Sequence, residues 1–397
     1  LKNVLSDFKL RASYASLGNQ DVANYLYIPT YGSTLQVNQI FDGARPVGIT
    51  PPGLVDPNIT WETATTLDLG FDMTLFNKLT TNFSWYRRRT TDILTDGSQY
   101  PAVLGATSPQ ANSGILQSKG FDLQINWRDK TSYGLSYNLT ATLSNYITTV
   151  VKFNGNAAQS LTTLYSGEKV GDIWGFETAG IYQNQDQVTN GPNETAYGIL
   201  TGKIYPGDVE FKDLDGNDTI SRGQNTLANH GDLRVIGNSS PKYAFSFNSF
   251  FSWKAFDLNI YLQGIGKRDY YLTDNLMWGA LNNGTLGTPT TGTLQVYNNS
   301  WTPDKPDAKY PAYKSGQSGD VVNAQTRFLE NAAYLRLKNI SLGYTLPASI
   351  AAKIAMQKLR LSVSGYNLLT FSGIPKIYDP DTLSPQKMPP HPQAPPI

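Results

Sequence analysis

One short acidic stretch has the residue types and the spacing of a cation-binding loop. Asp213, Asp215 and Asn217 stand at alternate positions. Calcium takes six to eight oxygen ligands, and alternate residues of a tight loop can direct several oxygens toward one centre. The pattern departs from an EF-hand loop, because Asp218 occupies the usual glycine position and Gln224 stands where a bidentate glutamate belongs. The stretch therefore predicts either a Ca2+ site or a solvated acidic turn.

The sequence offers little for catalysis. It has no cysteine and only two histidines, His230 and His391, which are far apart in the chain. Thiol catalysis, disulfide bonds and thiolate metal sites are therefore excluded, and a histidine-based zinc site or a serine–histidine triad is disfavoured. Glu210 and Asp213 have the residue types of a glycosidase pair, but nothing in their loop fixes the separation that such a pair requires. We predict that the protein is not an enzyme.

Aromatic residues in the expected long loops are the candidates for ligand contact. Their flat faces could stack on sugar rings, or the same side chains could pack the loops together. The candidate substrate-binding residues are Trp174, Phe176, Tyr270, Tyr271 and Trp278. The run Arg87-Arg88-Arg89 is interpreted as a solvated strand end near charged lipid headgroups rather than as a ligand patch. Because Lys plus Arg (32) nearly balance Asp plus Glu (31), we expect no nucleic-acid partner.

The elements that would hold these residues are strands with one apolar and one polar face. The clearest unit is Pro241–Gly264, a hairpin with a tight turn at Lys254-Ala255, whose residues alternate in polarity with period two. Each of its strands has about ten residues or more, the length with which a tilted strand crosses the hydrocarbon core of a bilayer. Aromatic residues gather at the turn, where a lipid–water boundary would lie: Phe251, Trp253 and Phe256.

The same plan recurs along the chain. Further hairpins are expected at Trp61–Leu94 and Leu116–Val151, and single strands near 5–17, in Phe328–Pro347 and in Lys358–Phe371. Ala348–Met356 has helical spacing. Short turns join the strands on one side and long polar segments on the other. Outer-membrane barrels have this asymmetry, with short periplasmic turns and long extracellular loops.

One expected strand does not sort its residues cleanly. In Phe328–Pro347, strict alternation places Leu335 and Leu337 on the face opposite to Ile340 and Leu342. The period of two therefore predicts a strand with apolar residues on both faces.

These patterns predict an all-β fold, an antiparallel transmembrane β-barrel that is partial in this chain, with about nine or ten strands. Residues 1–382 would form this part of the barrel, and 383–397 an atypical Pro-rich tail that cannot enter a sheet interior. Without an initiator methionine or signal peptide, the chain is expected to be a piece of a longer protein. Because the apolar face must meet lipid, the polar residues expected to line the lumen are Asp68, Asp72, Asn126, Asp257, Asn259 and Gln263.

Several segments together resemble the C-terminal half of a SusC/RagA-family TonB-dependent outer-membrane transporter of the Bacteroidota. In the order of that family, the matching segments are Phe8–Gln20, Trp61–Phe76, Trp85–Leu94, Asn112–Trp127, Pro206–Ser221, Pro241–Gly264, Phe328–Pro347 and Ser362–Phe371. The resemblance extends to about residue 382 and ends where the closing strand of the family should stand, because the Pro-rich tail replaces it.

The resemblance implies a plugged barrel of about 22 strands in the outer membrane of a Gram-negative bacterium. It implies active import of glycan oligomers or peptides, a SusD-like surface lipoprotein over the outer loops, and energy from the TonB–ExbB–ExbD complex. The plug and the TonB-contacting segment of the family are not in this chain. The alternatives are a secreted β-sandwich module that binds carbohydrate or acts as an adhesin, and a surface glycosidase. The repeated hairpins with aromatic turn ends favour the barrel.

Overall fold

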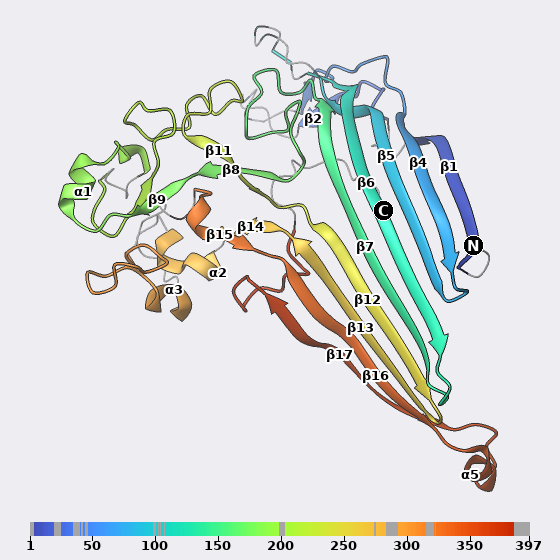
Figure 1. Ribbon diagram of the computed structural model, residues 1–397. Coiled ribbons are helices and arrows are strands. Elements are labelled where there is room, and N and C mark those ends of the chain that lie inside the picture. The colour runs from blue at the N-terminus through green and yellow to red at the C-terminus, as the bar shows by residue number, and fades with distance from the viewer. Residues whose placement is uncertain are drawn as a thin grey trace.

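The computed structural model describes residues 4–19, 25–34, 40, 43, 47–97, 101, 103, 105–106, 108–197, 203–273, 275–282, 293–314, 321 and 323–384. Its main element is a nine-stranded sheet in which each strand is antiparallel to its neighbours. The strands follow one another in space in the order in which they occur in the chain, as a broad wall with a separate group of loops at one end (Figure 1). The expected number of long strands and their antiparallel arrangement are confirmed.

The strands of the wall have the lengths expected for membrane crossing. They are β1 (Leu5–Asn19), β4 (Glu62–Leu75), β5 (Leu79–Asp96), β6 (Gln110–Lys130), β7 (Ser136–Lys152), β12 (Lys242–Trp253), β13 (Phe256–Lys267), β16 (Tyr334–Thr345) and β17 (Arg360–Ser372). Strands β1 and β17 are the edges of this sheet, and each pairs with one neighbour in it. Of the expected tail, residues 385–397 lie outside the described residues.

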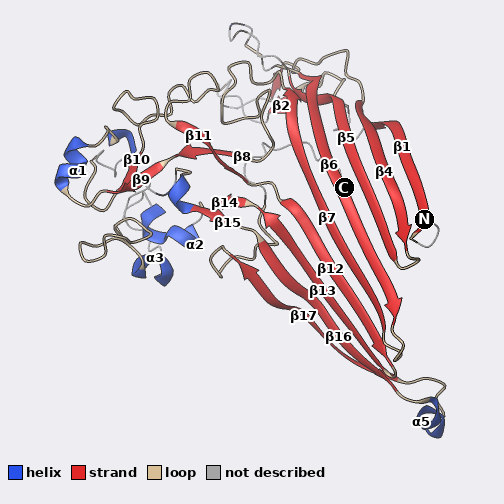
Figure 2. Cartoon of the chain, in the orientation of Figure 1, coloured by secondary structure: helices blue, strands red, loops and turns tan. Residues whose placement is uncertain are grey.

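The connections at one end of the wall are short. Phe76 and Asn77, with φ of 54° and 56°, form the turn between β4 and β5, and Lys254, with φ of 53°, begins the turn between β12 and β13. Positive φ at these positions gives the turn a twist that matches the twist of the flanking strands. The connection between β16 and β17 contains helix α5 (Ala348–Lys353), which lies far from the other helices (Figure 2). The expected helical segment is therefore confirmed.

An apolar row crosses all nine strands on one face of the wall. Residues that lie directly opposite in antiparallel strands share a face, so the register identifies the members of a row. We define the apolar row as Leu10, Phe71, Phe83, Leu123, Leu143, Phe245, Gly264, Leu335 and Phe371, each directly opposite the next. Glycine is its one member without an apolar side chain, and the ring of Phe245 covers that position.

A polar row lies one residue away, on the opposite face. We define it as Lys9, Asp72, Asn82, Gln124, Thr142, Ser246, Gln263, Arg336 and Thr370, again each directly opposite the next. Hydrogen bonds connect several neighbours, including Asn82 Nδ2 to Asp72 Oδ1 at 2.8 Å and Thr142 with Ser246 at 2.7 Å. The sheet thus has one face of each kind along its whole width.

A β-bulge in β16 corrects the prediction that this strand carries apolar residues on both faces. Leu262 of β13 pairs with Leu337, whereas the preceding residue, Tyr261, pairs with Asn339, so Lys338 is an extra residue. An extra residue in a strand moves every side chain that follows it to the opposite face of the sheet. Leu335 and Leu337 therefore share the apolar face with Ile340 and Leu342.

The apolar face of the wall is not covered by a second sheet in the part of the chain that the structure describes. Phe247 is exposed, and Phe245, Leu258 and Ile260 are half-buried. In a β-sandwich these side chains would lie in the core between two sheets. The alternative of a β-sandwich module is therefore wrong.

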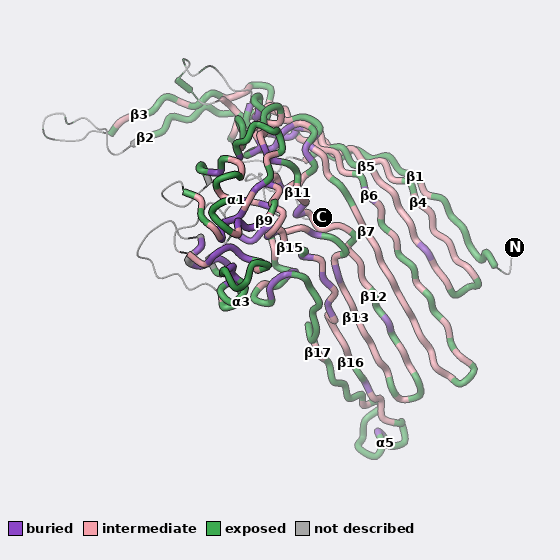
Figure 3. Tube along the Cα trace, turned by 60° about the vertical axis from the view of Figure 1, so that its left-hand side comes forward, coloured by how far each residue is buried: buried purple, intermediate pink, exposed green. Residues whose placement is uncertain are grey.

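The buried core of this chain lies in the long loops instead (Figure 3). These loops contain strands β2 (Gly32–Thr34), β3 (Gly48–Thr50), β8 (Asp172–Phe176), β9 (Thr178–Ile181), β10 (Val209–Phe211), β11 (Leu233–Asn238), β14 (Asp269–Tyr271) and β15 (Leu329–Asn331), and helices α1 (Gln185–Asn190), α2 (Asn275–Trp278) and α3 (Leu294–Asn298). Segments 161–233 and 271–328 supply the side chains of this loop core. No helix among the described residues is long and apolar enough to span a membrane.

Candidate functional site

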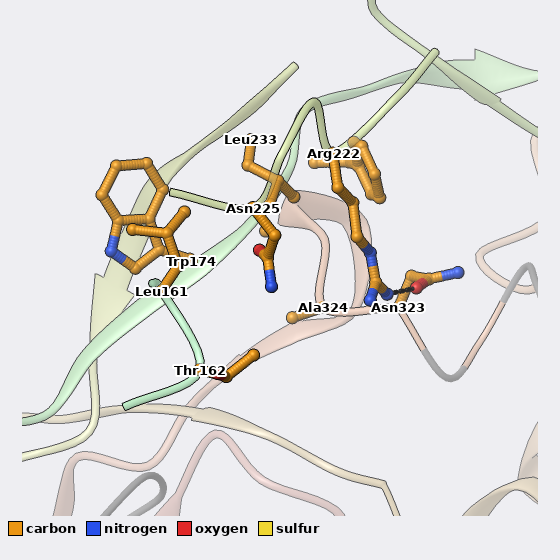
Figure 4. A pocket seen from close by; sticks show the side chains of 10 residues that line it. Leu161, Thr162, Trp174, Arg222, Asn225, Leu233, Asn323 and Ala324 are labelled. Carbon is orange, nitrogen blue, oxygen red and sulfur yellow. Dashed lines mark hydrogen bonds between the residues drawn. The ribbon is translucent and has the colours of Figure 1, made fainter. Parts of the chain in front are cut away.

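A cavity of about 180 Å³ in the loop core brings together residues from four segments of the chain (Figure 4). Its lining consists of Leu161, Thr162, Trp174, Gly175, Phe176, Arg222, Asn225, Leu233, Asn323 and Ala324. Backbone hydrogen bonds join the segments, from Phe176 N–H to Ala324 C=O at 2.9 Å and from Leu161 N–H to Asn225 C=O at 2.9 Å. A Cβ at Gly175 would lie 2.4 Å from the oxygen of Ala324, so only glycine permits this approach.

The lining of the cavity pairs a flat indole with amide groups and a guanidinium. Trp174 donates its Nε1–H to the hydroxyl of Tyr165 at 3.0 Å and lies against the ring of His230, 5.5 Å between ring centroids. Arg222 is exposed and donates to the Oδ1 of Asn323. Small-molecule sites commonly combine apolar or aromatic walls with a few placed polar groups. This cavity has both, and its volume is enough for one small ring.

The structure corrects the prediction of substrate contact for three of the five aromatic candidates. Phe176, Tyr271 and Trp278 are each at most 2% exposed and belong to the loop core. Side chains so completely packed offer no open face to a sugar ring. Trp174 and Tyr270 are partly buried against the same core. Of the five, Trp174 and Phe176 line the cavity, and Trp174 is the one with an accessible part.

The six predicted lumen residues share one face of the wall. Asp72 and Gln263 belong to the polar row, and the other four have the same parity in their strands: Asp68, Asn126, Asp257 and Asn259. Two of these aspartates form ion pairs with arginines of other strands. Arg11 Nε lies 3.1 Å from Asp72 Oδ2, and Arg360 Nε lies 2.9 Å from Asp257 Oδ1. That this face encloses a lumen stays a prediction of the pattern.

The acidic stretch folds as a tight loop around its own backbone amides. Asp213 accepts hydrogen bonds from the N–H groups of Gly216 and Asp218 at 2.7 Å each, and the amide of Asp218 holds the pKa of Asp213 below its usual range. Asp215 accepts from the N–H of Asn217 at 3.1 Å. The structure adds Asp232, which is fully buried and whose carboxylate oxygen lies within 4.8 Å of oxygens of Asp213 and Asp215. Asp232 could not be recognised from the pattern of the stretch, because it lies outside the loop.

Calcium binding by this loop stays a prediction, with Asp213, Asp215 and Asn217 as ligands. We expect Ca2+ to protect the backbone between residues 213 and 221 from limited proteolysis, because oxygen ligands held by one ion cannot open separately. The measurement compares cleavage of the full-length protein in Ca2+ and in excess chelator, with cleavage elsewhere in the chain as the internal control. Equal cleavage under both conditions would show a solvated acidic turn.

Glu194 is a buried acidic residue with a strongly raised pKa. Burial raises the pKa of Glu194 to about 8, and its Oε1 accepts hydrogen bonds from the Tyr182 hydroxyl at 3.2 Å and the Phe211 N–H at 2.7 Å. A carboxyl that stays protonated at neutral pH is what a general acid needs. Glu194 is only 2% exposed, however, and its partners are structural groups of the loop core, so no substrate bond can reach it in this arrangement.

The sequence alone did not identify the residues of the cavity other than Trp174 and Phe176. Arg222, Asn225 and Asn323 are common surface residue types, and none of them stands in a recognisable motif. The one available signal was the nearness of Arg222 to the acidic loop at 213–218. Asn323 comes from a different loop, so only the tertiary structure brings it to Arg222.

Comparison with curated proteins finds relatives along nearly the whole chain. It is 31% identical over 391 residues to TonB-dependent receptor P3 of Formosa agariphila, covering 94% of this chain and 36% of that protein. It is 26% identical over 371 residues to TonB-dependent receptor SusC of Bacteroides thetaiotaomicron, covering 86% of this chain and 32% of that protein. The chain thus spans about a third of the length of these relatives. No protein-family model matches it.

Comparison with solved structures finds the same architecture. The structure of the RagAB peptide transporter matches 94% of this chain and 38% of that chain, with a TM-score of 0.70 and 22% identity. The RagAB peptide importer in the open-open state matches 96% of this chain and 38% of that chain, with a TM-score of 0.73 and 22% identity. At this identity the likeness concerns the fold, and it supports the interpretation of the wall as part of a larger barrel.

Proposed function

We infer that this chain, which is part of a SusC/RagA-like TonB-dependent transporter, forms a section of barrel wall and outer loops in an importer of glycan oligomers or peptides. The observation that carries the inference is the pair of rows across the wall, one apolar and one polar over all nine strands. A wall of this kind separates lipid from an aqueous interior. The peptide class is supported by the structural relative described as a peptide importer, and the glycan class is what the resemblance to the SusC/RagA family implies.

The orientation of the wall follows from hydrogen-bond and solvation chemistry. Strands can cross a bilayer because a closed barrel satisfies every backbone N–H and C=O between strands. The apolar row then meets the acyl chains, and the polar row, with Asp72 and Gln263, lines the lumen. The short turns face the periplasm and the long loops face the outside. This orientation assigns the chain to the outer membrane of a Gram-negative bacterium, and the relatives from Formosa and Bacteroides support a member of the Bacteroidota.

In the proposed orientation, the cavity at Trp174 and Arg222 lies on the extracellular side of the wall, because it belongs to the loop core. A nutrient passing from outside to the lumen would meet these loops first. The indole can cover an apolar ring face, while Arg222 and Asn225 can donate to hydroxyl, carbonyl or carboxylate oxygens. A SusD-like surface lipoprotein would close over the same loops. The TonB–ExbB–ExbD complex would supply energy through parts of the transporter outside this chain.

We propose that the chain performs no bond chemistry. Two sets of acidic residues have the residue types of catalytic groups: the pair Glu210 and Asp213, and the buried Glu194. Asp213 accepts hydrogen bonds from its own loop, and Glu194 is sealed into the loop core. The relatives are described as receptors or transporters, which agrees with a binding role.

The proposal is tested by uptake in cells that carry the full-length transporter. We expect Trp174→Ala to lower uptake of a labelled oligosaccharide or peptide about tenfold or more, because truncating an aromatic contact residue typically costs that much affinity. The control is Trp253→Ala, at a short turn on the opposite end of the wall, which should leave uptake unchanged at the same level of protein in the outer membrane.

Two results would contradict the proposed function. One is release of the full-length protein from membranes without detergent, as expected of a secreted module. The other is equal uptake of both ligand classes by wild-type cells and by cells in which the gene is deleted. Loss of uptake in both tryptophan variants would instead show a general folding defect, which the amount of heat-modifiable barrel on a gel detects.

A further inference from the structure

The apolar face of β5 and β6 ends in three basic residues. Arg87 lies directly opposite Lys119, one step beyond the pair Trp85 and Phe121 on the same face. Arg89 follows on that face, opposite Gln117. We call Arg87, Arg89 and Lys119 the basic cluster. The cluster occupies the apolar face of β5 and β6. These two strands lie side by side in the wall (Figure 1).

The position of the basic cluster along the strands matches the boundary of the outer leaflet. From the short-turn end, the same face of β5 and β6 carries the opposed pairs Leu79 with Trp127, Thr81 with Ile125, Phe83 with Leu123 and Trp85 with Phe121. Aromatic girdles mark the interfaces of outer-membrane barrels. The cluster begins directly after Trp85 and Phe121, toward the long loops, and therefore at the level of the outer headgroups.

Among the described residues, the basic cluster has no ion-pair partner. All three side chains are exposed, and no carboxylate of the described residues forms an ion pair with them. Like charges directly opposite in a sheet repel. An anion between Arg87 and Lys119 would offset this repulsion. Guanidinium and ammonium groups make charge-assisted hydrogen bonds to phosphate oxygens.

We propose that the basic cluster binds the phosphate of a phosphorylated lipid headgroup in the outer leaflet. The inference rests on the outward orientation of the apolar face in the proposed function and adds a lipid ligand to it. A lipid fits better than free phosphate, because Trp85 and Phe121 lie next to the cations and would contact the apolar part of the same molecule. Phosphate and acyl chain would thus be recognised by adjacent residues.

The chain contains a matched control for this proposal. Arg88 stands between Arg87 and Arg89, has the same charge and is also exposed, but it pairs with Ser118 and Thr66 on the polar face. Replacing Arg88 removes one positive charge from β5, as replacing Arg87 or Arg89 does. A lipid on the apolar side would not contact it.

The test measures lipid A binding by the delipidated full-length transporter in detergent, using native mass spectrometry. We expect the triple variant Arg87→Gln, Arg89→Gln, Lys119→Gln to bind lipid A on the order of a hundredfold more weakly, because each cation near an anionic surface contributes about fivefold. Arg88→Gln should bind like the wild type. Dephosphorylated lipid A should bind to the wild type as weakly as lipid A binds to the triple variant.

The contrary outcomes distinguish a failure of the lipid site from a failure of the proposed function. Equal lipid A binding by a heat-modifiable triple variant and the wild type would overturn the lipid site and leave the importer intact. Displacement of lipid A by equimolar inorganic phosphate would also overturn it, because the cluster would then be a free-phosphate site. Loss of binding in Arg88→Gln but not in the triple variant would show that the faces are reversed, which would overturn the proposed orientation itself.

Discussion

Replacing Trp278 with alanine is expected to destabilise the loop core by about 3–5 kcal/mol, the usual cost of truncating a large buried aromatic side chain. Trp278 is 1% exposed, donates its Nε1–H to the Leu272 carbonyl at 2.6 Å, and has ring contacts with Tyr310 and Phe328 at 5.8 and 5.0 Å between centroids. Removing it leaves a cavity and an unsatisfied carbonyl. The expected result is local unfolding of the loops while the wall stays folded.

Limited proteolysis of the full-length transporter in detergent measures this effect. Cleavage within the loops that supply the core should increase sharply in Trp278→Ala, and the heat-modifiable migration of the barrel should persist. The matched control is Leu276→Ala in the same short helix, since Leu276 is 57% exposed and its truncation should change little. Equal protection of the Trp278→Ala and Leu276→Ala variants would mean that the loops do not depend on a shared core.

Replacing Ile260 with lysine is expected to destabilise the barrel by about 2–4 kcal/mol, the cost of a cation near the midplane on the lipid face of such a barrel. Ile260 lies opposite Ser249 and Ile340 in the middle of β13, with apolar neighbours along the strand at Leu258 and Leu262. The neighbouring position, Asn259, lies on the polar face opposite Phe250 and Ser341. Asn259→Lys is therefore the matched control and should cost less than about 1 kcal/mol.

Equilibrium unfolding by urea or guanidinium in phospholipid vesicles measures both variants of the full-length transporter. The difference between them is the informative quantity, because the two substitutions add the same side chain at adjacent residues. A larger loss of stability in Asn259→Lys than in Ile260→Lys would place lipid against the polar row. In that case the assignment of lumen residues, Asp72 and Gln263 included, would have to be reversed.

Much of the wall could be predicted because its signal is local. Successive side chains of a strand point to opposite faces, so the sequence at Pro241–Gly264 already separates Phe245 and Leu258 from Ser246 and Asp257. Turns are local as well, and Lys254-Ala255 marks a hairpin without knowledge of any neighbour. Strict alternation failed at Lys338, where the extra residue of a bulge is defined by pairing with β13.

The candidate site could be predicted only in part, because its members meet through long-range packing. Trp174 was found by residue type, but nothing in the sequence distinguished it from Phe176 and Trp278, which the loop core buries. Arg222 reaches the cavity and Asn323 through the closure of two long loops. Aromatic side chains serve cores and ligand sites equally well, so residue type alone does not decide between the two.

The sequence by itself determined the class of this protein, a wall of amphipathic antiparallel strands with short turns at one end and long loops at the other, since alternation is written residue by residue. Only the tertiary structure decided that the loops share a core, that Lys338 restores the apolar face of β16, and that Arg87 stands opposite Lys119. Each of these depends on which strand or loop lies beside which, and that choice is settled by packing and register across the whole chain.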